Sequence, residues 1–260
     1  MTMFRIVTAV TAGALTLGIL AGCDGFSVGQ RRLDFDQTEA VKITKIALEP
    51  GSGDVVVSTA AVSDVRIKRV VRYWGSEPGS TYVIEGTELR IDTDCGSRCG
   101  VSYEIVAPTG VSVSGENGSG DIELSDVGDV DVKVGSGDIT LIGASGTVRA
   151  QTGSGDIDLS RVGTASTVRT GSGSVNGHGL GGTVDATTGS GDIVLTLDTA
   201  GSVNARASSG SIELTVPAGA YRVRSTSSSG TARSELADDP TATNRLDLQT
   251  ASGDITITPR

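Results

Sequence analysis

The sequence predicts an all-β, single-domain protein folded as a parallel β-helix, or solenoid, with coils of about 18 residues and less regular strands at its N-terminal end. Three observations lead to this prediction. Glycine is abundant, with 37 copies in 260 residues, whereas aromatic residues make up only 3% of the chain. A glycine-containing motif recurs at a near-constant interval, and apolar residues alternate with polar ones between its copies. The core must therefore be built from Val, Ile, Leu and Ala in an architecture with many turns.

The recurring motif is Gly-Ser-Gly-Asp followed by Ile or Val. Full copies occupy residues 51–55, 118–122, 135–139, 153–157 and 189–193, and degenerate copies occupy residues 171–175, 208–212, 228–231 and 251–255. From residue 118 onward the copies begin 17 to 23 residues apart. So regular an interval indicates a repeat architecture in which each unit is one supersecondary element.

Each unit contains two short runs in which apolar residues lie two apart, as one face of a β-strand requires. Ile139 and Leu141 are an example of the first run, and Val148 and Ala150 of the second. The residues between the runs are too few for a helix. An up-and-down meander of hairpins is the alternative, but it would not need the same residues at the same point of every unit. Stacked coils would, because equivalent residues then lie ~4.8 Å apart in a continuous ladder. We therefore expect successive units to stack as coils of a solenoid.

Less regular segments precede and interrupt the repeats. Four longer strands are expected before the first regular coil, at residues 41–46, 54–58, 64–73 and 80–92. Residues 23–40 are expected to form a tether, the solenoid domain to cover residues 41–260, and residues 237–244 to form a loop inserted in the last full unit. Tyr73 and Trp74 form an adjacent aromatic pair. We expect them to close the N-terminal end of the solenoid, because an open end must be covered; anchoring a partner is the alternative.

The N-terminus has the layout of a bacterial lipoprotein signal. Arg5 is followed by an uncharged stretch rich in Ala, Val, Leu and Gly, and then by Leu20-Ala-Gly-Cys23. This tetrapeptide resembles a lipobox, whose cysteine is acylated after the signal, here residues 1–22, is removed. An ordinary signal peptide or an uncleaved anchor, for which the apolar stretch is short, are the alternatives. Cys23 is the expected lipidation site, and two acyl chains there would hold the protein firmly on a membrane of the cell envelope.

Export places Cys95 and Cys99 outside the cytoplasm, where disulfides persist. Residues 87–94 and 101–107 resemble two strands of a hairpin with the cysteines at its bend. A disulfide is therefore expected, and the chain-entropy estimate of its contribution is about 2 kcal/mol. Free thiols or a metal pair are the alternatives. Against a metal pair, the spacing is not the two-residue gap of zinc and redox motifs, and no second cysteine pair completes a site.

Composition restricts the function further. The chain has 21 basic and 31 acidic residues, a net charge of −10, which disfavours binding to nucleic acid. His178 is the only histidine, so multi-histidine metal sites are excluded and histidine-dependent catalysis would have to use this residue. Because glycines flank it, we expect His178 to be an exposed turn residue. No catalytic residue and no cofactor are predicted.

One aspartate closes most copies of the motif, and stacking would align the side chains of Asp121, Asp138, Asp156, Asp192 and Asp254. Carboxylates ~4.8 Å apart repel by about 0.9 kcal/mol in water, so another interaction must offset the repulsion. Bridging Ca²⁺ is one hypothesis. In the other, each aspartate accepts hydrogen bonds from the amides of its own turn. The structural interpretation is favoured, because Ser or Thr replaces the aspartate at positions 174, 211 and 231. No metal site is predicted.

Charged residues on the expected outward faces suggest two further functions. Outward positions on the second strand of several coils carry basic residues, namely Lys133, Arg149, Arg169, Arg222 and Arg224. A basic stripe of this kind would bind an anionic envelope polymer, but a solvated face is the preferred interpretation. Acidic residues on neighbouring coils could cleave polysaccharides. Such a groove usually needs aromatic platforms, and residues 118–260 contain a single aromatic residue, so an enzyme is not expected.

The chain resembles the bacterial "putative adhesin" β-solenoid domains, a family of unknown function. The resemblance covers about residues 40–260. It rests on the recurring Ser-Gly-Asp-Ile and on a strand ending in Val-Pro-Ala-Gly, here Leu214-Thr-Val-Pro-Ala-Gly219. It implies the solenoid fold and, by its name, surface adhesion, and it offers no catalytic residues.

Together these features predict a non-enzymatic, lipid-anchored cell-envelope protein, an adhesin-like scaffold or interaction surface. Its expected partners are the membrane, through Cys23, and an unknown envelope protein or polysaccharide. The alternative is a polysaccharide-binding or polysaccharide-cleaving β-helix protein.

Overall fold

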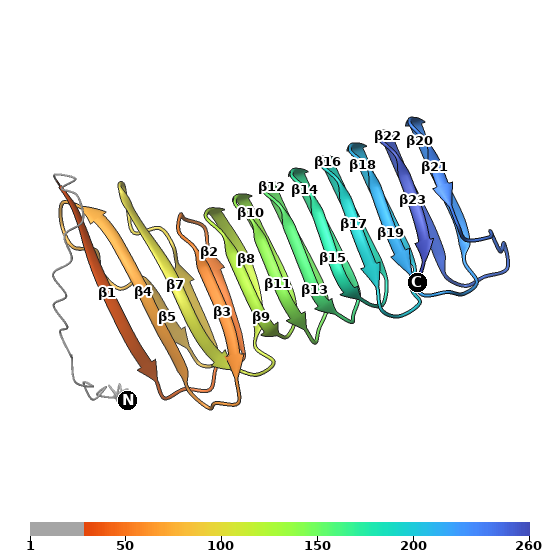
Figure 1. Cartoon of the computed structure of the whole chain (residues 1–260). Helices are drawn as coiled ribbons and strands as arrows, with labels where there is room; N and C mark the ends of the chain where they lie inside the picture. Colours follow the sequence, from red (N-terminus) through yellow and green to blue (C-terminus); the bar gives the residue numbers. More distant parts are fainter. Residues whose placement is uncertain (1–28) are drawn as a thin grey trace, which may run out of the picture.

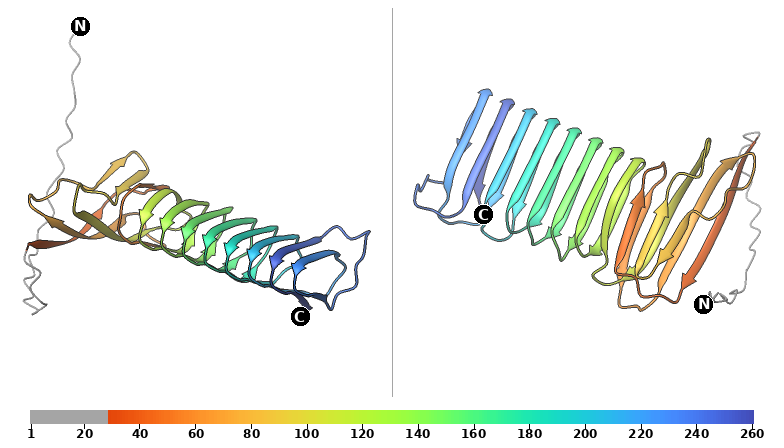
Figure 2. Two further views of the ribbon diagram at one scale, coloured as in Figure 1. Left: turned by 90° about the horizontal axis from the view of Figure 1, so that it is seen from above. Right: turned by 180° about the vertical axis from the view of Figure 1, so that it is seen from behind.

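Two long β-sheets face each other along an elongated solenoid in the computed structural model, which describes residues 29–260 (Figures 1 and 2). The predicted all-β solenoid is confirmed. No helix occurs between residues 29 and 260, and hence none that is long and apolar enough to cross a membrane. The expected signal peptide and Cys23 lie outside the described residues.

The first sheet, sheet A, has twelve strands. Their spatial order is β1 (Gln30–Glu39), β4 (Val65–Trp74), β7 (Cys99–Pro108), β3 (Val55–Ala60), β9 (Ile122–Val127), β11 (Ile139–Ala144), β13 (Ile157–Val162), β15 (Val175–Leu180), β17 (Ile193–Leu197), β19 (Ile212–Val216), β23 (Ile255–Pro259) and β21 (Ala232–Ser234). Sheet B has eleven strands, in the order β20 (Arg222–Ser229), β22 (Arg245–Ser252), β18 (Val203–Ser209), β16 (Val184–Ser190), β14 (Ser166–Ser172), β12 (Val148–Ser154), β10 (Val130–Ser136), β8 (Ser112–Ser119), β2 (Lys45–Glu49), β6 (Glu88–Asp92) and β5 (Tyr82–Glu85).

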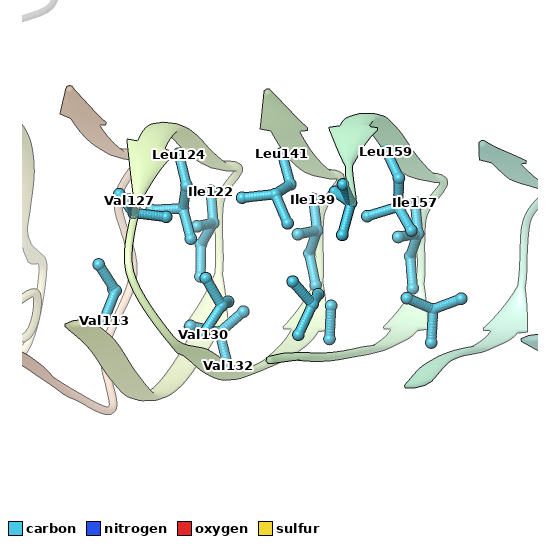
Figure 3. Close-up of a cluster of buried hydrophobic side chains, with 14 of the residues drawn as sticks. Val113, Ile122, Leu124, Val127, Val130, Val132, Ile139, Leu141, Ile157 and Leu159 are labelled. Atoms are coloured by element: carbon cyan, nitrogen blue, oxygen red, sulfur yellow. The ribbon is translucent and has the colours of Figure 1, made fainter. Parts of the chain in front are cut away.

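Each regular coil contributes one strand to each sheet, and equivalent residues of neighbouring coils are paired. In sheet A, Ile139 lies directly beside Ile157, and Leu141 beside Leu159, in a parallel register. All four side chains are buried between the sheets (Figure 3). In sheet B the inward residues are smaller, as in the pair Val148 and Ser166. The core is thus a ladder of aliphatic side chains that repeats from coil to coil, at the ~4.8 Å spacing of paired strands.

The Gly-Ser-Gly-Asp motif forms the corner at which the chain passes from sheet B to sheet A. Its second glycine has a positive φ in every copy, for example 143° at Gly155. A Cβ atom at Gly155 would lie 2.1 Å from the carbonyl oxygen of Gly137, the equivalent glycine of the preceding coil. Glycine is therefore required at this position both by the backbone conformation and by the close approach of the next corner.

The N-terminal strands depart from the regular pattern. β1 pairs antiparallel with β4, and β4 pairs antiparallel with β7. The tether expected over residues 23–40 is therefore wrong from residue 30 onward, because Leu33 and Phe35 on β1 pack against the core. The long strand expected over residues 80–92 is also wrong: a turn at Gly86, whose φ is 63°, divides it into the hairpin β5–β6. The strand expected over residues 41–46 begins later, at Lys45, and continues to Glu49 as β2.

The hairpin expected around the two cysteines does not form. β6 ends at Asp92 in sheet B, and β7 begins at Cys99 in sheet A, so the segment between them crosses from one sheet to the other. The two segments are joined by a single isolated antiparallel bridge, between Asp94 and Gly100. The prediction failed because both segments alternate as strands, and alternation does not indicate which sheet a strand joins.

Arg69 is the charged side chain buried at the N-terminal end of the core. Its guanidinium lies 4.2 Å from the ring centre of Phe35 and 5.3 Å from that of Tyr82, and it donates a hydrogen bond of 2.8 Å to Thr81.

The expectation that Tyr73 and Trp74 together close the N-terminal end of the core is wrong. Tyr73 points into the core, whereas 41% of Trp74 is exposed on the outer face of β4.

The last two coils are not stacked in chain order. The coil formed by β22 and β23 lies between the β18–β19 coil and the β20–β21 coil, although it follows both in the sequence. Inward positions of β22 and β23 carry Leu246, Leu248, Ile255 and Ile257, all with no exposed surface. The inward positions of β20 and β21 are mostly polar or small, such as Ser225, Ser227, Ala232 and Ser234. Because a terminal coil has one face in solvent, the polar coil caps the solenoid. Residues 237–244, expected as an inserted loop, belong to the connection that returns the chain by one coil.

The corner geometry predicts that Gly155→Ala destabilises the fold by more than about 3 kcal/mol, because the new Cβ meets the backbone of Gly137 at an unfavourable φ. Gly163→Ala is the matched control. Gly163 lies in the opposite corner with an ordinary φ and open space around it. The free energy of unfolding of the Gly163→Ala variant should therefore differ from that of the wild type by less than about 0.5 kcal/mol. Denaturant unfolding of the two variants measures the difference, and equal stabilities would contradict this account of the motif.

Candidate interaction surfaces

The motif aspartates form a hydrogen-bonded row along the corners of the solenoid. Oδ1 of Asp121 accepts the amide N–H of Asp138 at 2.9 Å, Oδ1 of Asp138 accepts that of Asp156 at 2.8 Å, and Asp156 accepts that of Ser174 at 2.7 Å. The expectation that each aspartate serves the amides of its own turn is therefore wrong: the donor belongs to the next coil. Each carboxylate links two neighbouring corners.

Serine takes the same role where it replaces aspartate. The hydroxyl of Ser174 accepts the amide of Asp192 at 3.3 Å, and that of Ser211 accepts the amide of Asp254 at 3.2 Å. At the last corner, the backbone amide and hydroxyl of Thr231 donate to Asp254 and hold the pKa of that carboxyl below its usual value. These amide contacts are the favourable interaction that opposes the repulsion between stacked carboxylates.

A second set of hydrogen bonds supports the same corners from inside the core. Buried threonines at the end of the sheet B strands donate to the carbonyl of the corner glycine in the preceding coil: Thr152 to Gly137 at 2.9 Å, and Thr170 to Gly155 at 2.8 Å. Within residues 29–260, no three His, Cys, Asp or Glu side chains gather in a group that could hold a metal ion. The atoms of the motif are thus arranged for stacking.

The outer face of sheet B carries charges of both signs. Strand register places Arg149 beside Asp131 in one row of outward side chains. Lys133, Gln151 and Arg169 lie side by side in the next row. The basic stripe considered as the alternative to a solvated face does not form through Lys133, Arg149 and Arg169, because these residues belong to two separate rows. Lys133 also forms an ion pair of 3.0 Å with Glu116. Arg224 lies outermost, on the terminal coil, and Arg222 donates a hydrogen bond to the carbonyl of Pro240.

The outer face of sheet A is also polar. His178 lies on β15 beside Ser160 of β13 and is exposed, so its expected place in a turn is wrong, although its exposure is as expected. Neighbouring outward positions carry Asp158 and Asn176, joined by a hydrogen bond of 2.9 Å. Both sheets therefore present flat, hydrophilic surfaces whose side chains repeat with the coil.

A hollow of about 520 Å³ lies at the N-terminal end of the molecule, outside sheet A. The side chains around it come from four segments: Gln30 of β1, Ser52 of the corner between β2 and β3, Arg72 and Trp74 of β4, and Asp94 and Arg98 of the crossing between β6 and β7. Sequence reasoning did not find this hollow. Its residues are far apart in the chain. The one sequence feature that pointed to a binding site here was the aromatic residue Trp74, which was expected to close the end of the core.

Cys95 and Cys99 are joined by a disulfide at the edge of this hollow, with their Cα atoms 5.2 Å apart. The five-residue loop that they close is held by two further contacts. The amide of Gly96 donates to Asp94 at 2.8 Å, and the amide of Cys99 donates to the carbonyl of Gly96 at 3.1 Å. Arg98 within the loop has a φ of 62°, in the left-handed region.

Comparison with known proteins identifies the family. The family described as Toastrack DUF4097 matches residues 31–258, which is nearly the whole of the described solenoid. The chain belongs to this family. No curated protein matches it. Among solved structures, this Toastrack chain is similar to a "putative adhesin" from Bacteroides fragilis NCTC 9343, with 15% identity over 87% of this chain and 97% of that one and a TM-score of 0.49.

Two further solved structures show weaker similarity to the Toastrack chain. A "putative cell adhesion protein" from Clostridium sporogenes ATCC 15579 shares 12% identity over 88% of this chain and 100% of that one, with a TM-score of 0.28. A "putative adhesin" from Parabacteroides merdae ATCC 43184 shares 10% identity over 86% and 95% of the two chains, also with a TM-score of 0.28.

The corner hydrogen bonds predict the effect of replacing one aspartate. Asp156→Ala removes the acceptor for the amide of Ser174 and should lower the free energy of unfolding by about 0.5–1.5 kcal/mol. Asp156→Ser should cost less, because serine already accepts this bond at positions 174 and 211. A chelator should leave the melting temperature of the wild type unchanged. If Ca²⁺ bridged the row, the chelator would lower the melting temperature by many degrees and added Ca²⁺ would restore it.

Proposed function

We propose that this protein is a non-enzymatic, lipid-anchored component of the bacterial cell envelope, whose Toastrack solenoid presents an adhesin-like interaction surface to an envelope protein or polysaccharide. The observation that supports this proposal most directly is the use of the repeated motif. Its glycines, aspartates and threonines are occupied in joining one coil to the next. The repeats therefore make an extended scaffold, and recognition falls to the side chains on its outer faces.

The geometry of those faces suits recognition of an extended partner. Paired strands hold outward side chains ~4.8 Å apart along the solenoid axis, and the twelve strands of sheet A make an array roughly 50 Å long. Residues such as Arg149, Thr167 and Asp185 lie in one straight row on successive coils of sheet B. A partner with a regular repeat would meet equivalent spacing on such a surface.

The proposed anchor would place the domain close to the membrane. Six residues lie between Cys23 and Gln30, the first residue of β1, so seven Cα–Cα steps join them. Fully extended, such a segment spans at most roughly 25 Å. The N-terminal end of the solenoid would therefore stay near the lipid surface while the repeats extend from it.

The anchor is tested by Cys23→Ser, which removes the acylated thiol. We expect the wild type to partition into the detergent phase and the variant to appear in the aqueous phase, because two acyl chains supply the membrane affinity. Cys95→Ser is the matched control, since it removes a cysteine without affecting the lipobox. Unchanged partitioning of the Cys23 variant would contradict lipid anchoring.

The interaction is tested with the released Cys23→Ser chain, immobilised and incubated with envelope extract that is untreated, protease-digested or periodate-oxidised. Retention of a saturable component is expected, and its loss after one treatment identifies it as protein or polysaccharide. The heat-unfolded chain serves as the control for non-specific retention. Equal retention on folded and unfolded chain would contradict an interaction surface made by the solenoid.

A further inference from the structure

We propose that the hollow beside Trp74 binds an acidic saccharide, a sugar ring that carries a carboxylate. The site lies at the N-terminal end of the molecule and not on the repeated faces, so it depends neither on the lipid anchor nor on the scaffold role proposed above. It is an open surface hollow of about 520 Å³, so a sugar bound there would keep one face in solvent. Its walls combine an aromatic platform, two cations, the carboxylate of Asp94 and neutral hydrogen-bonding groups.

The two cations of the hollow have no ion-pair partner among residues 29–260. Neither Arg72 nor Arg98 forms an ion pair with any residue in the described part of the chain, although the protein carries a net charge of −10. Strand register also places Arg72 directly opposite Arg32 of β1, which pairs with Asp34 at 2.8 Å. Like charges opposite each other destabilise a sheet. An anion bound at Arg72 would relieve this repulsion and satisfy the unpaired guanidinium groups.

Trp74 supplies the surface for a ring. It is 41% exposed on the outer face of β4, and register places it opposite Gln30 of β1. Every other aromatic side chain between residues 29 and 260 is at least partly buried. On the other side of Arg72 the register partner is Gly100, where a Cβ would lie 2.9 Å from the carbonyl oxygen of Ser52, so Ser52 borders the hollow on this side. The exposed part of the indole borders the same hollow as the guanidinium groups of Arg72 and Arg98.

The site is held in a defined geometry. Arg72 and Trp74 project from β4, which is paired on both sides, with β1 and with β7. Arg98 belongs to the loop closed by the Cys95–Cys99 disulfide, and this loop keeps its backbone in the left-handed region. The backbone that carries these groups is therefore fixed before the ligand arrives, and the entropic cost of binding is limited to ordering the exposed side chains.

The mixture of groups distinguishes an acidic sugar from other anions. An inorganic phosphate would use the two guanidinium groups but not the indole. A carboxylated sugar uses both, because the guanidinium groups bind the carboxylate while the apolar face of the ring packs on Trp74. Its hydroxyls can then bond the side chains of Gln30 and Asp94, which also line the hollow.

The test is a titration of the full chain, purified in detergent, with a short oligogalacturonate. Trp74 is the only tryptophan of the chain, so its fluorescence reports directly on this site. We expect a saturable change in emission with the acidic oligomer and none with a neutral maltose-series oligomer of equal length. Arg72→Gln and Arg98→Gln should each weaken binding by about 10-fold or more, measured by calorimetry, because each removes a charge-assisted hydrogen bond. Trp74→Ala should weaken it comparably.

Two controls make the result specific. Arg169→Gln removes an exposed arginine on sheet B, and its affinity should equal that of the wild type. Reduction of the Cys95–Cys99 disulfide should weaken binding, because it frees the loop that carries Arg98. Equal affinity for the acidic and neutral oligomers, or an unchanged affinity in both arginine variants, would overturn the proposal. Binding to phosphatidylglycerol vesicles or inorganic phosphate without binding to the oligogalacturonate would overturn it in favour of a lipid or a simple anion site.

Discussion

The close stacking of the Gly-Ser-Gly-Asp corners is the constraint on which the rest of the structure depends. Each corner lies so near the next that a Cβ at Gly155 would meet the carbonyl of Gly137 at 2.1 Å. Only at this separation can the carboxylate of Asp138 reach the amide of Asp156, and the hydroxyl of Thr152 the carbonyl of Gly137. The corners therefore tolerate only the coil spacing that strand pairing gives, and the aliphatic ladder inside repeats at the same interval.

The same constraint explains where function can reside. A motif whose donors and acceptors are engaged with neighbouring coils offers little to a ligand, so the most repeated residues of this chain are structural. The variable residues lie on the outer faces and at the irregular N-terminal end. That end differs because its antiparallel strands and the crossing between β6 and β7 follow no repeat, and side chains as distant as Gln30 and Arg98 meet there.

The order of the last coils shows how burial overrides chain order. The coil containing Leu246 and Ile257 lies inside the stack, and the polar coil containing Ser225 and Ser227 lies at its end. Transfer of the apolar side chains from solvent to the interior favours this arrangement, at about 25 cal/mol for each Å² removed from water. The polarity of the inward positions was visible in the sequence, but the repeat interval alone predicts stacking in order.

The sequence by itself determined the solenoid, its coil length, the inward residues and the equivalence of Asp and Ser at the corner, because each follows from local periodicity. Only the tertiary structure decided which amide each aspartate accepts, since that donor lies one coil away. It also decided the sheet that each N-terminal strand joins, the participation of residues 30–39 in sheet A and the assembly of the hollow at Trp74. These features depend on contacts between segments distant in the chain, which a periodic pattern does not encode.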